Sequence, residues 1–293
     1  MDQSVAELFT NWDVSWVASS ALFVVATLYA IGWIRAHETR PNQLRPWRLV
    51  AFLSGIISVF VAIASPLDTL SESLLFMHMA QHFVLMSVAP PLIVLGAPVV
   101  PVLRGLPRLA IRACLRPLLG SQVVRSLSRV IMLPSISWMA MNVAYVGWHI
   151  PAAYEFALQS EGWHNVEHAC FFFTSILFWW PVIRPWPSHQ RPMQLSAVPY
   201  LLAADLVNTG VSAFLCFSGR LIYPSYATEV RPVPISPLND QIAAGAFMWV
   251  FGSMIFLIPV AAVIMQVLSA RGTAVDSGPI NAQQLTYVQR EAV

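Results

Sequence analysis

The chain has 293 residues, of which 57% are hydrophobic and only 10% are charged. A soluble domain of this length carries about 25% charged residues, so the composition excludes an ordinary soluble protein. The formal net charge of +2 is too small to suggest binding to nucleic acid. Runs of about 20 apolar residues, the length that crosses a bilayer core about 30 Å thick, recur along the chain and predict an integral membrane protein.

Seven apolar stretches, bounded by charged residues or Pro, predict a single all-α domain over residues 1–293, a bundle of seven transmembrane helices. Acidic residues precede the first stretch, whereas a cleavable signal peptide opens with basic residues, so we do not expect one. Residues 271–293, rich in Gly, Ala, Gln and Ser, are expected to form a solvated tail. The predicted spans are Val14–Trp33, Leu49–Ala64, Ser73–Leu95, Val130–Trp148, His164–Ile183, Ala197–Phe217 and Gln241–Leu268.

The placement of Arg predicts the orientation of the bundle, because cytoplasmic loops carry an excess of basic residues. All sixteen basic residues are Arg, and fourteen of them fall in alternate connections or in the C-terminal tail. The two others, Arg220 and Arg231, lie in the last connection on the opposite side. This alternation fits an odd number of spans and predicts an N-terminus outside the cytoplasm and a C-terminus inside it.

The connection at residues 99–129 is rich in Arg. Arg104, Arg108, Arg112 and Arg116 recur every four residues among Leu, Ile and Ala. That spacing places the charges on one helical face and predicts an amphipathic helix on the cytoplasmic membrane surface, with its Arg side chains contacting anionic lipid headgroups. The alternative is a docking surface for a partner protein.

Five of the seven His fall at the outer ends of three predicted helices. His78 and His82 are four residues apart on the third helix, and His164 and His168 repeat this spacing on the fifth. Residues four apart lie on one helical face. His149 ends the fourth helix at the same level, so the five imidazoles converge if these three helices pack together.

Ionisable residues inside a bilayer are costly and indicate function by default. A cluster of His in an apolar bundle is typical of a transition-metal site, since neutral imidazole binds copper, zinc and iron. Met86 continues the face of His78 and His82, and Asp240 opens the seventh helix at the outer surface, so both are weaker candidate ligands. A bis-His haem is a competing interpretation, because two His from facing helices ligate haem iron. The structural alternative is that each His bonds a neighbouring carbonyl or carboxylate.

A short motif overlaps the second His pair. His164, Glu167 and His168 form the pattern H-x-x-E-H, the inverted signature of zinc peptidases. A hydrolase would use Glu167 as general base and would need a third metal ligand, which His78 or His82 could supply.

Mid-membrane polar residues are scarce elsewhere in the chain. Asp205 and Asn208 lie about one turn apart on the sixth predicted helix. They predict either a polar contact between helices or a path for a proton or ion.

Several longer motifs accompany these His. They are HMAQH at 78–82, APPL at 89–92, LGAP at 95–98, WHIPAAY at 148–154, HNVEH at 164–168, FWWP at 178–181 and DQIAAG at 240–245. Together they closely resemble the membrane-embedded CtaG family of cytochrome c oxidase assembly factors, the seven-helix proteins rather than the single-span copper protein of the same name. The resemblance runs from the second predicted helix to the seventh.

The resemblance implies a role in maturing a caa-type or related haem–copper oxidase, by delivering or inserting copper, in the plasma membrane of a bacterium. Combined with the His pattern, it predicts a copper chaperone rather than an enzyme. Copper would enter from the outer side, rest among the five His and pass by ligand exchange to the copper-containing oxidase subunit, with another copper chaperone as a further partner. A scaffold without metal, a haem protein and a zinc hydrolase are the alternatives.

Overall fold

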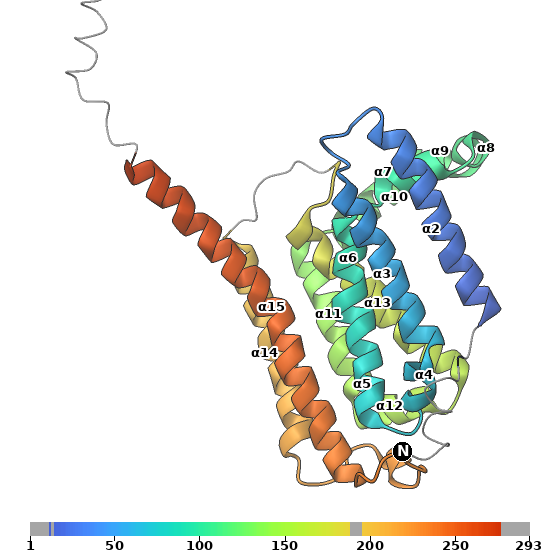
Figure 1. Ribbon diagram of the computed structural model, residues 1–293, viewed down its shortest axis with the longest axis vertical. Helices are drawn as coiled ribbons and strands as arrows, with labels where there is room; N and C mark the ends of the chain where they lie inside the picture. Colours follow the sequence, from blue (N-terminus) through green and yellow to red (C-terminus); the bar gives the residue numbers. More distant parts are fainter. Residues whose placement is uncertain (1–11, 13–14, 188–194, 277–293) are drawn as a thin grey trace, which may run out of the picture.

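The computed structural model describes residues 12, 15–187 and 195–276, with side chains up to residue 269 (Figure 1). These residues are helical along most of their length and contain no β-strand. The long helices are α2 (Trp16–His37), α3 (Pro46–Ala64), α11 (Pro134–His149), α13 (Glu161–Ile183), α14 (Ala197–Phe217) and α15 (Pro237–Asp276). The shorter elements are α4 (Pro66–Ser71), α5 (Leu75–Phe83), η1 (Val84–Val88), α6 (Ala89–Leu95), α7 (Val99–Gly105), α8 (Arg108–Ala110), η2 (Ile111–Leu115), α9 (Arg116–Gly120), α10 (Gln122–Ile131), α12 (Pro151–Leu158) and η3 (Pro224–Ala227).

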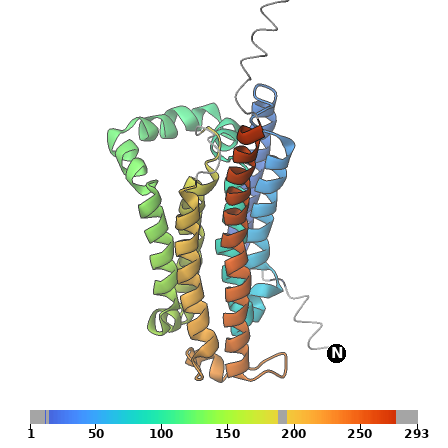
Figure 2. The same ribbon diagram turned by 90° about the vertical axis from the view of Figure 1, so that its left-hand side faces the viewer.

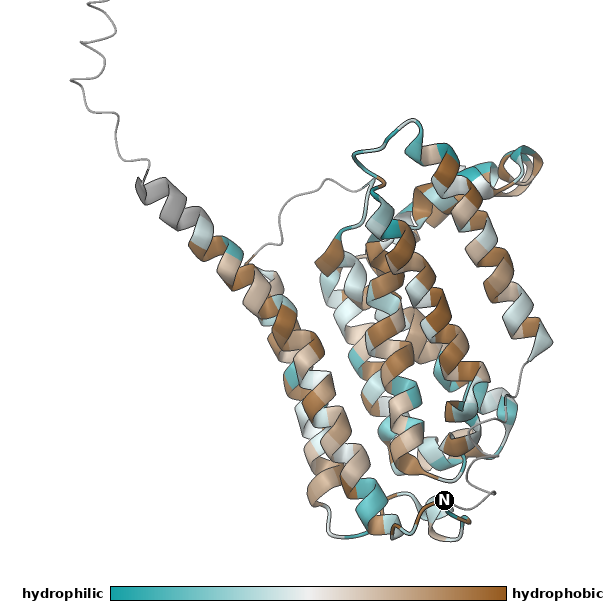
Figure 3. Ribbon diagram, viewed as in Figure 1, coloured by the Kyte–Doolittle hydropathy of each residue, from teal (hydrophilic) through white to brown (hydrophobic). Residues whose placement is uncertain are grey.

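Six helices among the described residues are long and apolar enough to cross a membrane. A seventh span is present if α10 and α11, which meet at an angle of 68°, are counted as one bent span. Figure 3 shows apolar residues along the helices, and large apolar side chains such as Phe23, Phe173 and Leu206 are exposed. An apolar surface of this extent fits a lipid environment. The chain is therefore a multi-pass membrane protein, and the prediction of an all-helical bundle is confirmed.

The helix boundaries follow the positions of Pro. Pro46, Pro66, Pro134 and Pro151 each occupy the first helical turn, where the missing backbone N–H is not needed. Within the third span, α5, η1 and α6 are continuous, and η1 is a π-helical turn just before Pro90 and Pro91. A π-helical turn relieves the clash between a proline ring and the preceding turn of helix.

The bundle has a central group of helices flanked on two sides. Figures 1 and 2 show α14 and α15 side by side along one flank, while α2 lies at the opposite edge. A larger hydrophobic core lies among α5, α11, α13, α14 and α15, and a smaller one joins α2 to α3, η1 and α6. The larger core surrounds the candidate site.

The contact between α2 and α7 is unusually close. A Cβ atom at Gly32 would lie 1.7 Å from the Pro101 carbonyl oxygen, and one at Gly105 would lie 1.9 Å from the Leu28 carbonyl oxygen. Small residues let membrane helices approach to this distance. Arg35 donates to the Arg104 carbonyl at 2.9 Å, and Arg104 donates to the Arg35 carbonyl at 3.1 Å. We call this contact the glycine joint.

The Arg-rich connection differs from the single amphipathic helix expected at residues 99–129. Pro107 interrupts the helical run, so Arg104 belongs to α7 and packs on α2. The later part, from α8 to α10, remains exposed, with Leu109, Leu118 and Val123 among its uncovered apolar residues.

The expected tail also begins later than predicted. Helix α15 continues to Asp276 and so includes the first residues of the predicted tail. The remaining part of the tail lies outside the described residues.

Candidate metal centre

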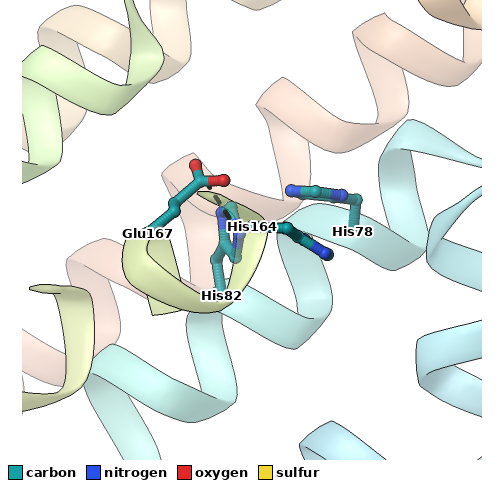
Figure 4. A group of neighbouring side chains, drawn as sticks. All are labelled: His78, His82, His164 and Glu167. Carbon is teal, nitrogen blue, oxygen red and sulfur yellow. Dashed lines mark ion pairs between the residues drawn. The ribbon is translucent and has the colours of Figure 1, made fainter. Parts of the chain in front are cut away.

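Four side chains point toward one another near one end of the bundle (Figure 4). His78 and His82 come from α5, and His164 and Glu167 come from α13. One donor atom from each of the four lies within 4.8 Å of the others. Donors that share an ion at about 2.1 Å lie at most about 4.2 Å apart. Small side-chain rotations would therefore bring all four onto one ion. We call these residues the four-donor cluster.

The helix spacing that predicted this convergence explains its geometry. His78 and His82 lie one turn apart, and their ring centroids are 4.2 Å from each other. His164 lies 5.1 Å from His78 by the same measure. Glu167 lies on the same face of α13, and its Oε1 is 3.9 Å from Nε2 of His82. Ser160 caps the start of α13 by accepting a hydrogen bond from the Trp163 backbone N–H.

Three of the four residues of the cluster are buried, and the polar atoms of these three have no hydrogen-bond partners. His78, His82 and Glu167 are 0%, 3% and 1% exposed. Neither ring nitrogen of His78 or His82, nor either carboxylate oxygen of Glu167, makes a hydrogen bond. Most buried polar groups in proteins are bonded, and leaving one unsatisfied costs about 1–3 kcal/mol. A bound metal ion would compensate this cost, so the residues present fit a metal site.

The two remaining predicted His lie beside the four-donor cluster. The His168 ring is 4.1 Å from His164 and 5.2 Å from His82, and the His149 ring is 6.5 Å from His82. Nδ1 of a neutral His149 donates to the Tyr145 carbonyl at 2.7 Å, which leaves the Nε2 lone pair free of a hydrogen bond. The structure thus gathers all five imidazoles, with His149 and His168 as neighbours of the cluster.

Asp240 has a different position from that expected of a ligand. Its carboxylate accepts hydrogen bonds from the backbone N–H groups of Leu75 at 2.8 Å and Phe76 at 3.1 Å. These are the first two residues of α5, whose preceding residue, Leu74, provides no side-chain cap. Asp240 therefore caps the helix that carries His78 and His82, by bonding the free backbone N–H groups of its first turn. This is a positioning role.

Met86 lies deeper than the cluster, in η1. It is outside the four-donor set but lines a cavity of about 40 Å³ together with His82 and His149.

The polar contact predicted on the sixth span forms through Asn208. Its side chain accepts a hydrogen bond from the Tyr145 hydroxyl at 3.0 Å and donates to the Met248 carbonyl at 3.3 Å. Asp205 does not join it, and its Oδ1 is buried without a hydrogen bond.

Three tyrosines close the end of the bundle, and of these only Tyr154 belongs to a motif, WHIPAAY at 148–154. The Tyr154 ring lies 5.1 Å from His78, and its hydroxyl is 3.1 Å from that of Tyr226. Tyr226 donates to the Ser71 carbonyl, and Tyr223 donates to the His149 carbonyl. Burial raises the pKa of Tyr154 and of Tyr226, so both remain neutral phenols. Their sequence signal is weak, because Tyr223 and Tyr226 come from a connection rather than a periodic helix.

Comparisons with known proteins connect this geometry to a family. The family described as cytochrome c oxidase caa3 assembly factor (CtaG) matches residues 27–270, which include the whole cluster. Two curated relatives are uncharacterized proteins, one of Mycobacterium leprae, 24% identical over 272 residues, and one of Mycobacterium bovis, 26% identical over 273 residues. Each alignment covers 90% of this chain, but the chain spans only 40% of the length of those relatives. No solved structure matches.

Proposed function

Because this chain belongs to the family of cytochrome c oxidase caa3 assembly factors, we propose that it holds copper in the four-donor cluster and delivers it to the oxidase during assembly. The observation that carries this proposal is the cluster itself. Two buried imidazoles, a half-buried one and a buried carboxylate converge in a membrane bundle, and most of their donor atoms lack any other partner. Imidazole is a good ligand for copper in either oxidation state.

The proposed orientation places the cluster on the outer side of the membrane. The Arg-rich connections lie at the opposite end from His78, as α5 and α13 begin at the cluster and run toward the end that carries α8 to α10 (Figure 1). By the positive-inside rule, the Arg-rich end faces the cytoplasm. Copper would then meet the cluster, and leave it, on the outer side of a bacterial plasma membrane.

Delivery requires that copper can leave, and the surroundings of the cluster supply exchange partners. His164 is half-buried, whereas His78 and His82 are buried, so His164 is the ligand through which copper arrives and departs. His168 lies against both His164 and His82 and can replace one imidazole by another. Copper is cargo in this scheme, and no covalent chemistry on a substrate is involved. The receiving partner is the copper-containing subunit of the oxidase.

One specific observation favours a second candidate, a zinc centre with hydrolytic activity. Glu167, the acidic residue of the H-x-x-E-H pattern, is a member of the four-donor cluster and its oxygens lack hydrogen bonds. Imidazole with carboxylate is also a common donor set for zinc. We favour copper because the family is defined by oxidase assembly.

Haem is a poorer fit to this geometry. The rings of His78 and His164 stack face to face, with an interplanar angle of 27°. Axial haem ligands instead point their nitrogens at a shared iron from opposite sides of the macrocycle.

The test is the metal content of protein purified in mild detergent, before and after anaerobic loading with Cu(I), with an absorption spectrum. The double variant His78→Ala, His82→Ala is compared with His37→Ala, whose ring bonds the Leu44 carbonyl at the opposite end of the bundle. We expect stoichiometric copper in the wild type and in His37→Ala, its loss in the double variant, and no Soret band.

Other outcomes would reject copper delivery. Zinc in the purified protein, with a hydrolytic activity that Glu167→Gln abolishes, would support the hydrolase. No bound metal after loading, with oxidase assembly intact in the double variant, would leave a scaffold as the better account.

A further inference from the structure

A small cavity lies next to the four-donor cluster, deeper in the bundle. Its volume is about 40 Å³, enough for a single bare ion or a water molecule. His82 and His149 contribute to its wall, so His82 belongs to both the cluster and the cavity. Both rings carry an Nε2 that makes no hydrogen bond.

Four methionines line this cavity, from three different parts of the bundle. Met79 and Met86 come from the third span, Met141 from α11 and Met248 from α15. Their exposed fractions are 1%, 8%, 5% and 6%. Methionines commonly fill gaps in a core. Here, however, they surround a space that they leave open, beside two imidazoles with free nitrogens.

Three other polar side chains of the wall are engaged in hydrogen bonds with the protein. The Tyr145 hydroxyl donates to Asn208, Asn208 donates to the Met248 carbonyl, and Asn142 donates to the Trp138 carbonyl at 2.8 Å. None of the described residues that line the cavity is acidic. Hard cations such as Ca²⁺ and Mg²⁺ prefer carboxylate oxygens, which this wall does not offer. Thioethers and neutral imidazoles instead select the soft ion Cu(I).

We propose that this cavity is a second copper site, specific for Cu(I), in which Met86, Met141 and Met248 act with His149. When both sites are filled, His82 stays with the outer ion, because a neutral imidazole has only one free lone pair. The proposal rests on the proposed function, because it assumes that copper reaches the four-donor cluster. His82 then connects an outer site, formed by imidazoles and one carboxylate, to an inner site dominated by thioethers. The two sites differ in ligand softness, so the inner one retains copper only in its reduced state.

The experiment uses the full chain in detergent, loaded anaerobically with Cu(I) in competition with a chromophoric Cu(I) chelator. Stoichiometry is measured by titration and the ligand type by copper X-ray absorption. The variant Met141→Leu, Met248→Leu removes two thioethers at nearly constant volume, a swap that cores tolerate well. Its matched control is Met139→Leu, Met254→Leu, on the same two helices, where the side chains are 55% and 49% exposed.

We expect the wild type and the matched control to bind two equivalents of Cu(I), with sulfur among the ligands. The variant Met141→Leu, Met248→Leu should lose the second equivalent and the sulfur signal but keep the copper bound by nitrogen. Thermal unfolding of both variants verifies that they are folded. Copper bound without sulfur ligands in the wild type would overturn the inner site and leave the proposed function intact. Failure to bind any Cu(I) would overturn both.

Discussion

The glycine joint and the four-donor cluster are polar regions of the same bundle with opposite construction. In the joint, Arg35 and Arg104 exchange hydrogen bonds with each other's backbone, and Arg104 also donates to Thr39 at 2.6 Å. In the cluster, His78 and His82 are fully buried or nearly so and make no hydrogen bond. Polar groups that satisfy one another stabilise a fold, whereas buried groups left unsatisfied destabilise it unless a ligand is bound. This difference supports a structural function for the joint and the proposed binding function for the cluster.

The largest expected effect is the loss of copper from the four-donor cluster without a loss of thermal stability. In His78→Leu, His82→Leu, unsatisfied polar groups are replaced by apolar side chains. We expect bound copper to disappear while the thermal unfolding temperature of the metal-free protein stays equal to or above that of the wild type. The measurements are metal analysis and thermal unfolding in detergent. A fall of many degrees in the unfolding temperature would show that these His stabilise the fold themselves.

At the glycine joint we expect a substitution to lower stability and to leave copper binding unchanged. Gly105→Ala forces a Cβ against the Leu28 backbone, which cannot yield, so α2 must move away from α7. We expect a loss of about 1–3 kcal/mol of stability, seen as a lower unfolding temperature, with copper per folded molecule unchanged. Gly210→Ala is the control, because a Cβ there meets nothing within 4 Å. It should be neutral or stabilising. Equal effects of the two substitutions would contradict the close packing.

Substitutions of Asp240 test whether this residue stabilises the fold, as the glycine joint does, or binds copper, as proposed for the four-donor cluster. Asp240→Ala removes both acceptors from the start of α5 and should cost about 1–2 kcal/mol, with a modest decrease in copper affinity as the first turn frays. Asp240→Asn keeps one acceptor and should recover part of the stability. Loss of copper with no change in the unfolding temperature would instead identify Asp240 as a ligand.

The smallest expected effect is that of Tyr154→Phe. The ring remains in contact with His78, and only the hydrogen bond to Tyr226 is lost. We expect a decrease in stability of about 0.5–1.5 kcal/mol and unchanged copper stoichiometry. If copper were lost, the hydroxyl would have to be part of the binding site.

The sequence predicted what depends on local pattern. Apolar length predicted the spans, and the four-residue spacing predicted that His78 and His82 share a face, as do His164 and His168. It also showed that the five His lie at one level, because the helices that carry them alternate in direction. Whether α5 faces α13 depends on packing, which no local pattern encodes.

Other features required the three-dimensional structure for similar reasons. The role of Asp240 depends on a contact across 164 residues of chain with Phe76. The break at Pro107 divides a segment that was expected to be one amphipathic helix. The bend between α10 and α11 lies just beyond Val130, where the fourth span was predicted to begin. The cavity lined by methionines arises from three separate segments, and helical spacing relates Met86 to His82 and Met141 to His149 only within their own helices.

The π-helical turn η1 divides the third span into two halves. It changes the direction in which the side chains of the second half point, relative to those of the first half. Each residue of an α-helix advances the chain by about 100°, so an extra residue in one turn rotates all that follows. Before the turn, α5 presents its His to α13. After it, α6 packs on α3, where a Cβ at Gly55 would lie 3.0 Å from the Ala89 carbonyl oxygen. Deleting one residue from Val84–Val88 would keep the span apolar and helical but would rotate one half by about 100° relative to the other. Either α5 would no longer present its His to α13, or α6 would no longer pack on α3.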